Sequence, residues 1–154
     1  MTSPDPAQFV RFPRDSTATD PRTKRKPVAD TRPDVELRIP ADSAFLSVLR
    51  TATAGLAARL DFTLDDIEDL RIAVDEACAM VLPQALPGSD LNCAFSLAGD
   101  TLRVAVAAIC DSPHPPSRDG FAWTVLSALT TTLAAEVDGD TLTVTLSRTS
   151  GNPA

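Results

Sequence analysis

The sequence predicts an α+β domain: a two-layer sandwich in which helices cover one face of a mixed β-sheet. Two observations support this fold class. Apolar residues recur at helical spacing over residues 44–60 and again over residues 64–82. Residues 91–97 and 102–109 alternate apolar and polar side chains on either side of Ala98-Gly-Asp, which is typical of a β-hairpin. Helices and strands that are grouped along the chain favour α+β over a parallel α/β fold.

Shorter signals predict the other elements. Residues 35–40 alternate apolar and polar side chains, and Pro40 ends this strand or places it at an edge of the sheet. Thr63, with Asp66 three residues further on, resembles a capping box at the start of the second helix. The expected order is strand, helix, helix, strand, strand, helix and strand, over residues 35–40, 44–60, 64–82, 91–97, 102–109, 121–135 and 141–147.

Charge is distributed unevenly along the 154 residues. Residues 1–34 carry seven basic and five acidic side chains, whereas residues 35–154 carry seven arginines, no lysine and sixteen acidic side chains. Seven of the 13 prolines lie in residues 1–40. We therefore expect residues 1–33 to be a disordered, proline-rich basic tail and residues 34–150 to form the folded domain. The basic run RTKRK, residues 22–26, is either an electrostatic contact or part of a leader that only increases solubility.

Composition also disfavours several functions. A net charge of −7 and a pI near 4.5 disfavour nucleic-acid binding, because phosphate contacts need lysine and arginine. No apolar run is long enough to span a membrane, and the N-terminus MTSPDPAQFVRFPRD lacks the apolar stretch of a signal peptide, so we expect a cytoplasmic protein. Three cysteines without a CxxC pair, with one histidine, predict neither a disulfide framework nor a zinc site.

Few residues suggest chemistry by their position alone. Glu76 lies on the second helix near the core position Val74, where a carboxylate facing a sheet could act as a general base; a helix-surface acid is the simpler interpretation. Asp111 ends a strand and opens a loop, so it is a candidate for ligand contact or an Asx-turn residue before Pro113. Spacing leaves both alternatives open, and no glycine-rich phosphate loop is present in the sequence.

One segment resembles a known family. The run from Leu60 to Cys78, LDFTLDDIEDLRIAVDEAC, is similar to the signature region of RsbW-like bacterial anti-sigma factors, which are serine-protein kinases with a histidine-kinase-like ATPase fold. The similarity extends over residues 35–148, with the elements in the right order, and is nearest to divergent actinobacterial members. The resemblance implies the histidine-kinase-like ATPase fold for this chain.

The resemblance also implies a partner-switching role. Members of the family hold an alternative sigma factor inactive and release it when an anti-anti-sigma factor of the STAS type binds in its place. Typical members bind ATP and Mg²⁺, phosphorylate a serine of the STAS protein, and dimerise. For this chain the resemblance implies an anti-sigma factor that is a homodimer and that contacts neither nucleic acid nor a membrane directly.

Several family positions can be assigned by residue. The resemblance places Glu76 at the general base, Asp111 at the aspartate that binds the adenine amino group, and Arg50 in the surface shared by sigma factor and antagonist. Met80 stands where the family has the asparagine that holds Mg²⁺, and a thioether is a poor ligand for a hard cation. Gly120 is what survives of a second glycine motif before the third helix.

The loop after Asp111 departs furthest from the family. The family reads Asp-x-Gly-x-Gly, whereas this chain reads Asp111-Ser-Pro113-His-Pro115. Proline fixes φ and lacks an N–H, so it cannot form the flexible turn around phosphates that glycine gives. The lid, residues 110–120, is also short. These departures predict weak or absent nucleotide binding.

Three hypotheses follow from these residues. The first is an anti-sigma factor with degenerate nucleotide-binding motifs, favoured by Met80 and the loop prolines. The second is an active ATP-dependent serine kinase that phosphorylates the STAS antagonist, favoured by the retained Glu76 and Asp111. The third is a redox-gated regulator in which Cys78 and Cys110 respond to oxidation. An unrelated interaction domain is a further alternative, and an exposed edge strand at residues 35–39 would allow a dimer.

Overall fold

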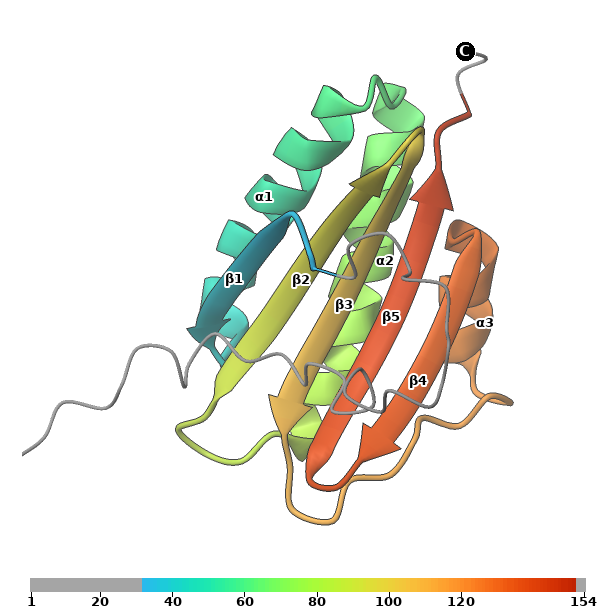
Figure 1. The fold of residues 1–154 in the computed structure, drawn as a ribbon. Helices are drawn as coiled ribbons and strands as arrows, with labels where there is room; N and C mark the ends of the chain where they lie inside the picture. Colours follow the sequence, from blue (N-terminus) through green and yellow to red (C-terminus); the bar gives the residue numbers. More distant parts are fainter. Residues whose placement is uncertain (1–31, 152–154) are drawn as a thin grey trace, which may run out of the picture.

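A computed structural model describes residues 32–151, which form one β-sheet with helices against one of its faces (Figure 1). The elements are β1 (Val35–Pro40), α1 (Leu46–Arg59), α2 (Leu64–Val81), β2 (Asp90–Ala98), β3 (Thr101–Ile109), α3 (Phe121–Leu129), β4 (Thr132–Asp138) and β5 (Thr141–Thr149). Short 3-10 turns, η3 (Ser43–Phe45) and η4 (Leu82–Gln84), precede α1 and follow α2. The predicted two-layer α+β sandwich is confirmed.

The sheet is antiparallel throughout, so the expectation of a mixed sheet is wrong. Its strand order is β1-β2-β3-β5-β4, and every neighbouring pair is antiparallel. The predicted order has only one strand after the third helix. A helix that connects two neighbouring strands of a sheet usually makes them parallel, so that strand would run parallel to β3. The additional strand β4 reverses the chain in a tight turn at Gly139, where φ is +59°, so that β5 enters between β3 and β4 in the antiparallel direction.

The third helix is shorter than predicted, and β4 takes its C-terminal part. The expectation for residues 121–135 was one helix, whereas α3 ends at Leu129. Three consecutive threonines follow at residues 130–132, and β-branched side chains disfavour the helix. Leu133 and Ala135 then pair with Leu146 and Val144 of β5. The strand is therefore stabilised by cross-strand pairing that no local window of sequence contains.

The cap predicted for the second helix is confirmed, and a second cap precedes the first helix. The Thr63 side chain accepts a hydrogen bond from the backbone N–H of Asp66 at 3.1 Å, which caps α2. Asp42 accepts from the N–H of Ala44 at 2.9 Å and starts η3, through which the chain enters α1. Both caps are local contacts, between residues two or three positions apart.

The core lies between the helices and one face of the sheet. Alternation along each strand places every second side chain toward the helices. The sheet contributes fully buried residues from its three central strands: Leu91, Cys93, Phe95, Leu102, Val104, Val106, Leu142, Val144 and Leu146. From α2 the matching residues are Leu70, Val74, Ala77 and Val81, which confirms most of the predicted stripe. This packing holds α2 across the centre of the sheet.

Two further expectations concern the N-terminal tail and membrane-spanning helices. The predicted disordered tail, residues 1–33, lies almost entirely outside the described residues. Among residues 32–151, no helix is both long enough and apolar enough to cross a membrane.

Candidate functional site

The helix α2 presents chemically different sides to α1 and to α3. On the α1 side, Asp75 pairs with Arg50. On the other side, Asp69 pairs with Arg148, whose guanidinium also donates to the carbonyl oxygen of Leu129 at the end of α3. Glu76 lies seven residues after Asp69, or about two helical turns, and therefore projects from the same α3-facing side. The helix thus separates the predicted general base from the predicted partner-binding arginine.

Glu76 keeps the features that a general base needs. Its side chain is partly buried on α2, and within residues 32–151 its carboxylate forms no hydrogen bond or ion pair. A carboxylate with free lone pairs can accept a proton from a hydroxyl placed beside it. Met80, one turn further on the same side, is partly buried and packs against the core.

The other residues that the family resemblance assigns to nucleotide binding are located from the C-terminal end of α2 to the start of α3. Asp111 is exposed and follows Cys110, which forms an isolated β-bridge with Ala85 just after η4. Gly120 is the N-cap of α3. The end of β3 and the segment after α2 therefore meet here. The loop of residues 111–120 leads from this point to Gly120 and the start of α3.

These residues do not fit ATP with Mg²⁺. The position that the family resemblance assigns to the metal carries the Met80 thioether, which is a poor ligand for a hard cation. The Gly120 N–H points into its own loop, where it donates to the Ser117 carbonyl at 3.4 Å. Pro113 and Pro115 offer no backbone N–H to a phosphate. The structure therefore gives no support for the nucleotide chemistry that the family resemblance implies.

Sequence reasoning missed a side chain that organises this loop. Gln84, the last residue of η4, hydrogen-bonds to the backbone of His114 through both atoms of its amide. Its Nε2 donates to the His114 carbonyl at 3.0 Å, and its Oε1 accepts from the His114 N–H at 2.9 Å. A glutamine after a proline at a helix end carries no sequence signal for such a contact, because its partner lies 30 residues away.

Arg50 is held by a specific partner rather than being free in solvent. Its Nε donates to both carboxylate oxygens of Asp75, at 2.8 and 2.9 Å. The two side chains remain 37% and 39% exposed, so the pair lies at the surface between α1 and α2. Because the bond uses Nε, the two terminal amino groups of the guanidinium form no hydrogen bond with another described residue. Arg50 is thus oriented and still able to bind a partner acceptor.

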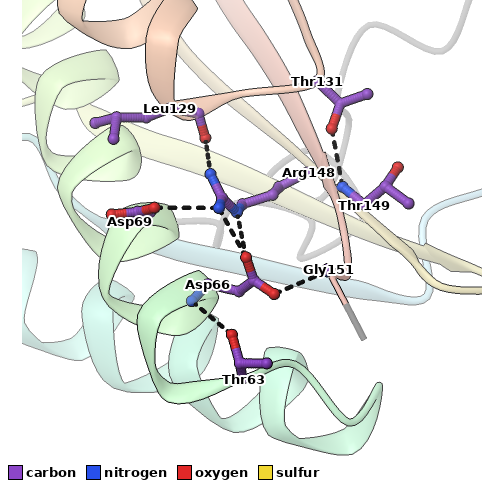
Figure 2. Close-up of polar contacts among 8 residues, drawn as sticks. All are labelled: Thr63, Asp66, Asp69, Leu129, Thr131, Arg148, Thr149 and Gly151. Carbon is purple, nitrogen blue, oxygen red and sulfur yellow. Dashed lines mark hydrogen bonds and ion pairs between the residues drawn. The ribbon is translucent and has the colours of Figure 1, made fainter. Parts of the chain in front are cut away.

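A second charge cluster ties three elements together at the opposite end of α2 (Figure 2). Arg148 of β5 donates through Nη2 to Asp66 at 2.7 Å, contacts Asp69 at 3.1 Å, and donates through Nη1 to Leu129 at 2.6 Å. The Gly151 N–H completes the cluster at Asp66 Oδ2, 2.8 Å away. The Arg148 bond, followed by the Gly151 bond, lowers the pKa of Asp66 from 3.8 to about 2. This cluster stabilises the fold and is separate from the candidate site.

The cysteines do not support the redox-gated hypothesis. Cys78, Cys93 and Cys110 are all buried and unpaired with one another. Burial raises the pKa of the Cys93 thiol to about 12, and it raises the pKa values of Cys78 and Cys110 as well. Since the thiolate is the form that oxidants attack, buried thiols with raised pKa values are poor redox sensors.

Comparison with known proteins places this geometry in context. The chain is 41% identical over 73 residues to a serine-protein kinase RsbW of Halalkalibacterium halodurans, a match that spans 47% of this chain and 45% of the relative. It is 33% identical over 105 residues to an anti-sigma-F factor RsbW of Mycobacterium tuberculosis, spanning 68% of this chain and 62% of the relative. No family model matches the chain.

A solved structure shows the same fold. The crystal structure of the RsbU and RsbW domains of Rv1364c from Mycobacterium tuberculosis matches 78% of this chain and 34% of that one, with a TM-score of 0.60 and 20% identity. These comparisons confirm the predicted resemblance, because the chain is RsbW-like in sequence and has the fold of an RsbW-containing structure. The matches span between about half and three-fifths of the two curated relatives.

Proposed function

We propose that this chain is an RsbW-like anti-sigma factor that sequesters an alternative sigma factor in the cytoplasm and releases it to a STAS-type anti-anti-sigma factor. The similarity to an anti-sigma-F factor over 105 residues supports this function. One observation favours sequestration without catalysis over an active kinase. The fold and the oriented Arg50 are retained, while the nucleotide positions carry Met80, Pro113 and Pro115. In this proposal the two partners exclude one another by competing for a shared surface.

The surface that we assign to the partners is the one around Arg50. Asp75 orients the guanidinium and leaves its terminal amino groups for an acceptor on the partner. The described residues carry 17 acidic and eight basic side chains, so the surrounding domain is acidic. Such a charge accelerates association with a basic partner surface more than it strengthens the final complex.

A second candidate function is an active serine kinase. The observation that favours it is Glu76, whose carboxylate is free among the described residues and faces the α3 side of α2. ATP and Mg²⁺ would be its cofactors, and the STAS protein its substrate. Incubation of the full chain with labelled ATP and the STAS protein separates the two functions. Label transfer in magnesium or manganese supports the kinase, and its absence supports sequestration alone.

Binding assays test the proposed function directly. We expect the full chain to form a complex with a sigma factor encoded near it, without nucleotide, and to lose that complex when the STAS protein is added. Arg50→Ala should weaken both complexes. Arg59→Ala is the matched control, because Arg59 is an exposed arginine at the end of the same helix. Equal effects of the two substitutions would contradict the role assigned to Arg50.

We also propose that the chain is a homodimer. Its sheet ends in two edge strands, β1 and β4, each of which pairs with only one neighbour among the described residues. An edge strand offers unpaired N–H and C=O groups to a second copy. Sedimentation of the purified chain at several concentrations tests this, and a single monomer mass at every concentration would refute it.

A further inference from the structure

The loop between β3 and α3 is attached to the rest of the domain at three points. At its start, Cys110 forms a β-bridge with Ala85, and the Leu86 N–H donates to the Ile109 carbonyl at 3.0 Å. In its middle, Gln84 binds the backbone of His114. Near its end, the Arg118 guanidinium lies 5.6 Å from the centre of the Trp123 ring, within cation–π range. We call residues 111–120 the strap.

The middle attachment uses the only backbone donor available to it. Residues 113–116 read Pro-His-Pro-Pro, so His114 carries the sole N–H in this stretch. Gln84 accepts from that N–H and donates to the carbonyl of the same residue, as a neighbouring β-strand would. The prolines restrict the backbone on both sides of His114, so ordering this stretch costs less entropy than ordering a glycine-rich loop. Two hydrogen bonds are therefore enough to fix it.

The contact between Gln84 and His114 lies close to the position that holds the metal ion in the family. Gln84 follows Met80 by four residues at the C-terminal end of α2. The strap is therefore held at η4, about one helical turn beyond the side chain at the family's metal position. A loop fixed there competes with any ligand that must enter between α2 and the start of α3. The backbone N–H and carbonyl of His114 are already engaged by Gln84.

We propose that Gln84 latches the strap closed across the end of α2, and that this latch is an autoinhibitory contact which excludes nucleotide independently of Met80. Opening of the strap and binding of nucleotide are then thermodynamically linked. If nucleotide binds only to the open strap, its apparent affinity falls by the fraction of molecules in which the strap is open. Weakening the latch should raise that fraction and the affinity by the same factor.

The test combines Gln84→Ala with Met80→Asn in the full chain. Hydrogen exchange at the His114 amide reports the latch, and the fluorescence of Trp123, the single tryptophan, reports the Arg118 end of the strap. Calorimetry with ATP and Mg²⁺ reports whether nucleotide can bind to the chain. We expect Gln84→Ala to speed His114 exchange about tenfold, because two net hydrogen bonds are lost. In the Met80→Asn background, in which we expect no detectable ATP binding, the same change should make ATP binding measurable by calorimetry.

Two controls make the outcome decisive. Gln84→Glu keeps the acceptor for the His114 N–H but loses the donor to its carbonyl, so its exchange rate should fall between that of the unsubstituted chain and that of Gln84→Ala. Thr124→Ala removes a hydroxyl bond to the carbonyl of Gly120, the last residue of the strap, and should leave His114 exchange unchanged. The proposal is overturned if Gln84→Ala changes His114 exchange by less than twofold, or if it speeds exchange without any gain in ATP affinity. Partner binding is measured separately, so failure of the latch leaves the anti-sigma proposal standing.

Discussion

Arg148 and Asp66, 82 residues apart in the sequence, form an ion pair with two hydrogen bonds to one carboxylate oxygen, at 2.7 and 3.2 Å (Figure 2). Their side chains are only 19% and 10% exposed. Arg148 also holds the last carbonyl of α3, so the pair joins β5, α2 and α3. It is the main electrostatic link between the C-terminal strand and the helical layer.

Asp66→Asn should destabilise the fold. The substitution keeps the size of the side chain and the Thr63 cap, which uses the backbone N–H, but leaves the Arg148 charge with only Asp69 as an ionic partner. We expect a loss of about 3 kcal/mol in the free energy of unfolding, the lower end for removing one partner of a buried ion pair. Glu68→Ala, which removes an exposed pair with Arg71, should cost less than about 1 kcal/mol. Chemical denaturation of the three proteins measures this, and equal losses would contradict it.

The same carboxylate should make stability depend on pH in the acid range. The pKa of Asp66 is about 2 in the folded chain against an ordinary 3.8, because Arg148 and the Gly151 N–H favour the ionised form. A lowered pKa means that the stabilisation is complete above pH 3.8 and is lost as the pH falls towards 2. Melting curves between these pH values should show a steeper decline for the wild-type chain than for Asp66→Asn. Parallel curves would show that Asp66 does not titrate in this window.

Asp75 should matter for partner binding more than for stability. Its bond to Arg50 is at the surface, so Asp75→Ala should change the free energy of unfolding by less than about 1 kcal/mol. It should nevertheless weaken binding of the sigma factor, because the Arg50 guanidinium loses its fixed orientation. A double-mutant cycle with Arg50→Ala should show non-additive losses in binding. Additive losses would mean that Asp75 acts on the partner by itself.

Met80→Asn alone should not create a nucleotide site. An asparagine would supply the oxygen that Mg²⁺ prefers, but Pro113, Pro115 and the latched strap would remain. We expect no heat of binding in calorimetry up to millimolar ATP, with or without Mg²⁺. Clear binding by this single variant would show that the methionine was the sole obstacle and that the loop is not one.

Local sequence predicted the elements whose signals are local. The stripes of α1 and α2, the Thr63 cap and the β2–β3 hairpin depend on residues within one or two turns of each other. The motif around Glu76 also lies within one helix, so both its position and its family resemblance could be identified from the chain alone. Strand β4 could not, because its alternating Leu133 and Ala135 become a strand only beside β5.

The contacts that define the candidate site and the stability of the fold needed the tertiary structure. Gln84 and His114 are 30 residues apart, Arg50 and Asp75 are 25 apart, and Asp66 and Arg148 are 82 apart. The sequence alone determined that this chain folds as an RsbW-like α+β domain with altered nucleotide positions, because periodicity and motif residues are local properties. Only the tertiary structure decided which charges pair and which loop is fixed, since those depend on distances that the packing of helices on the sheet creates.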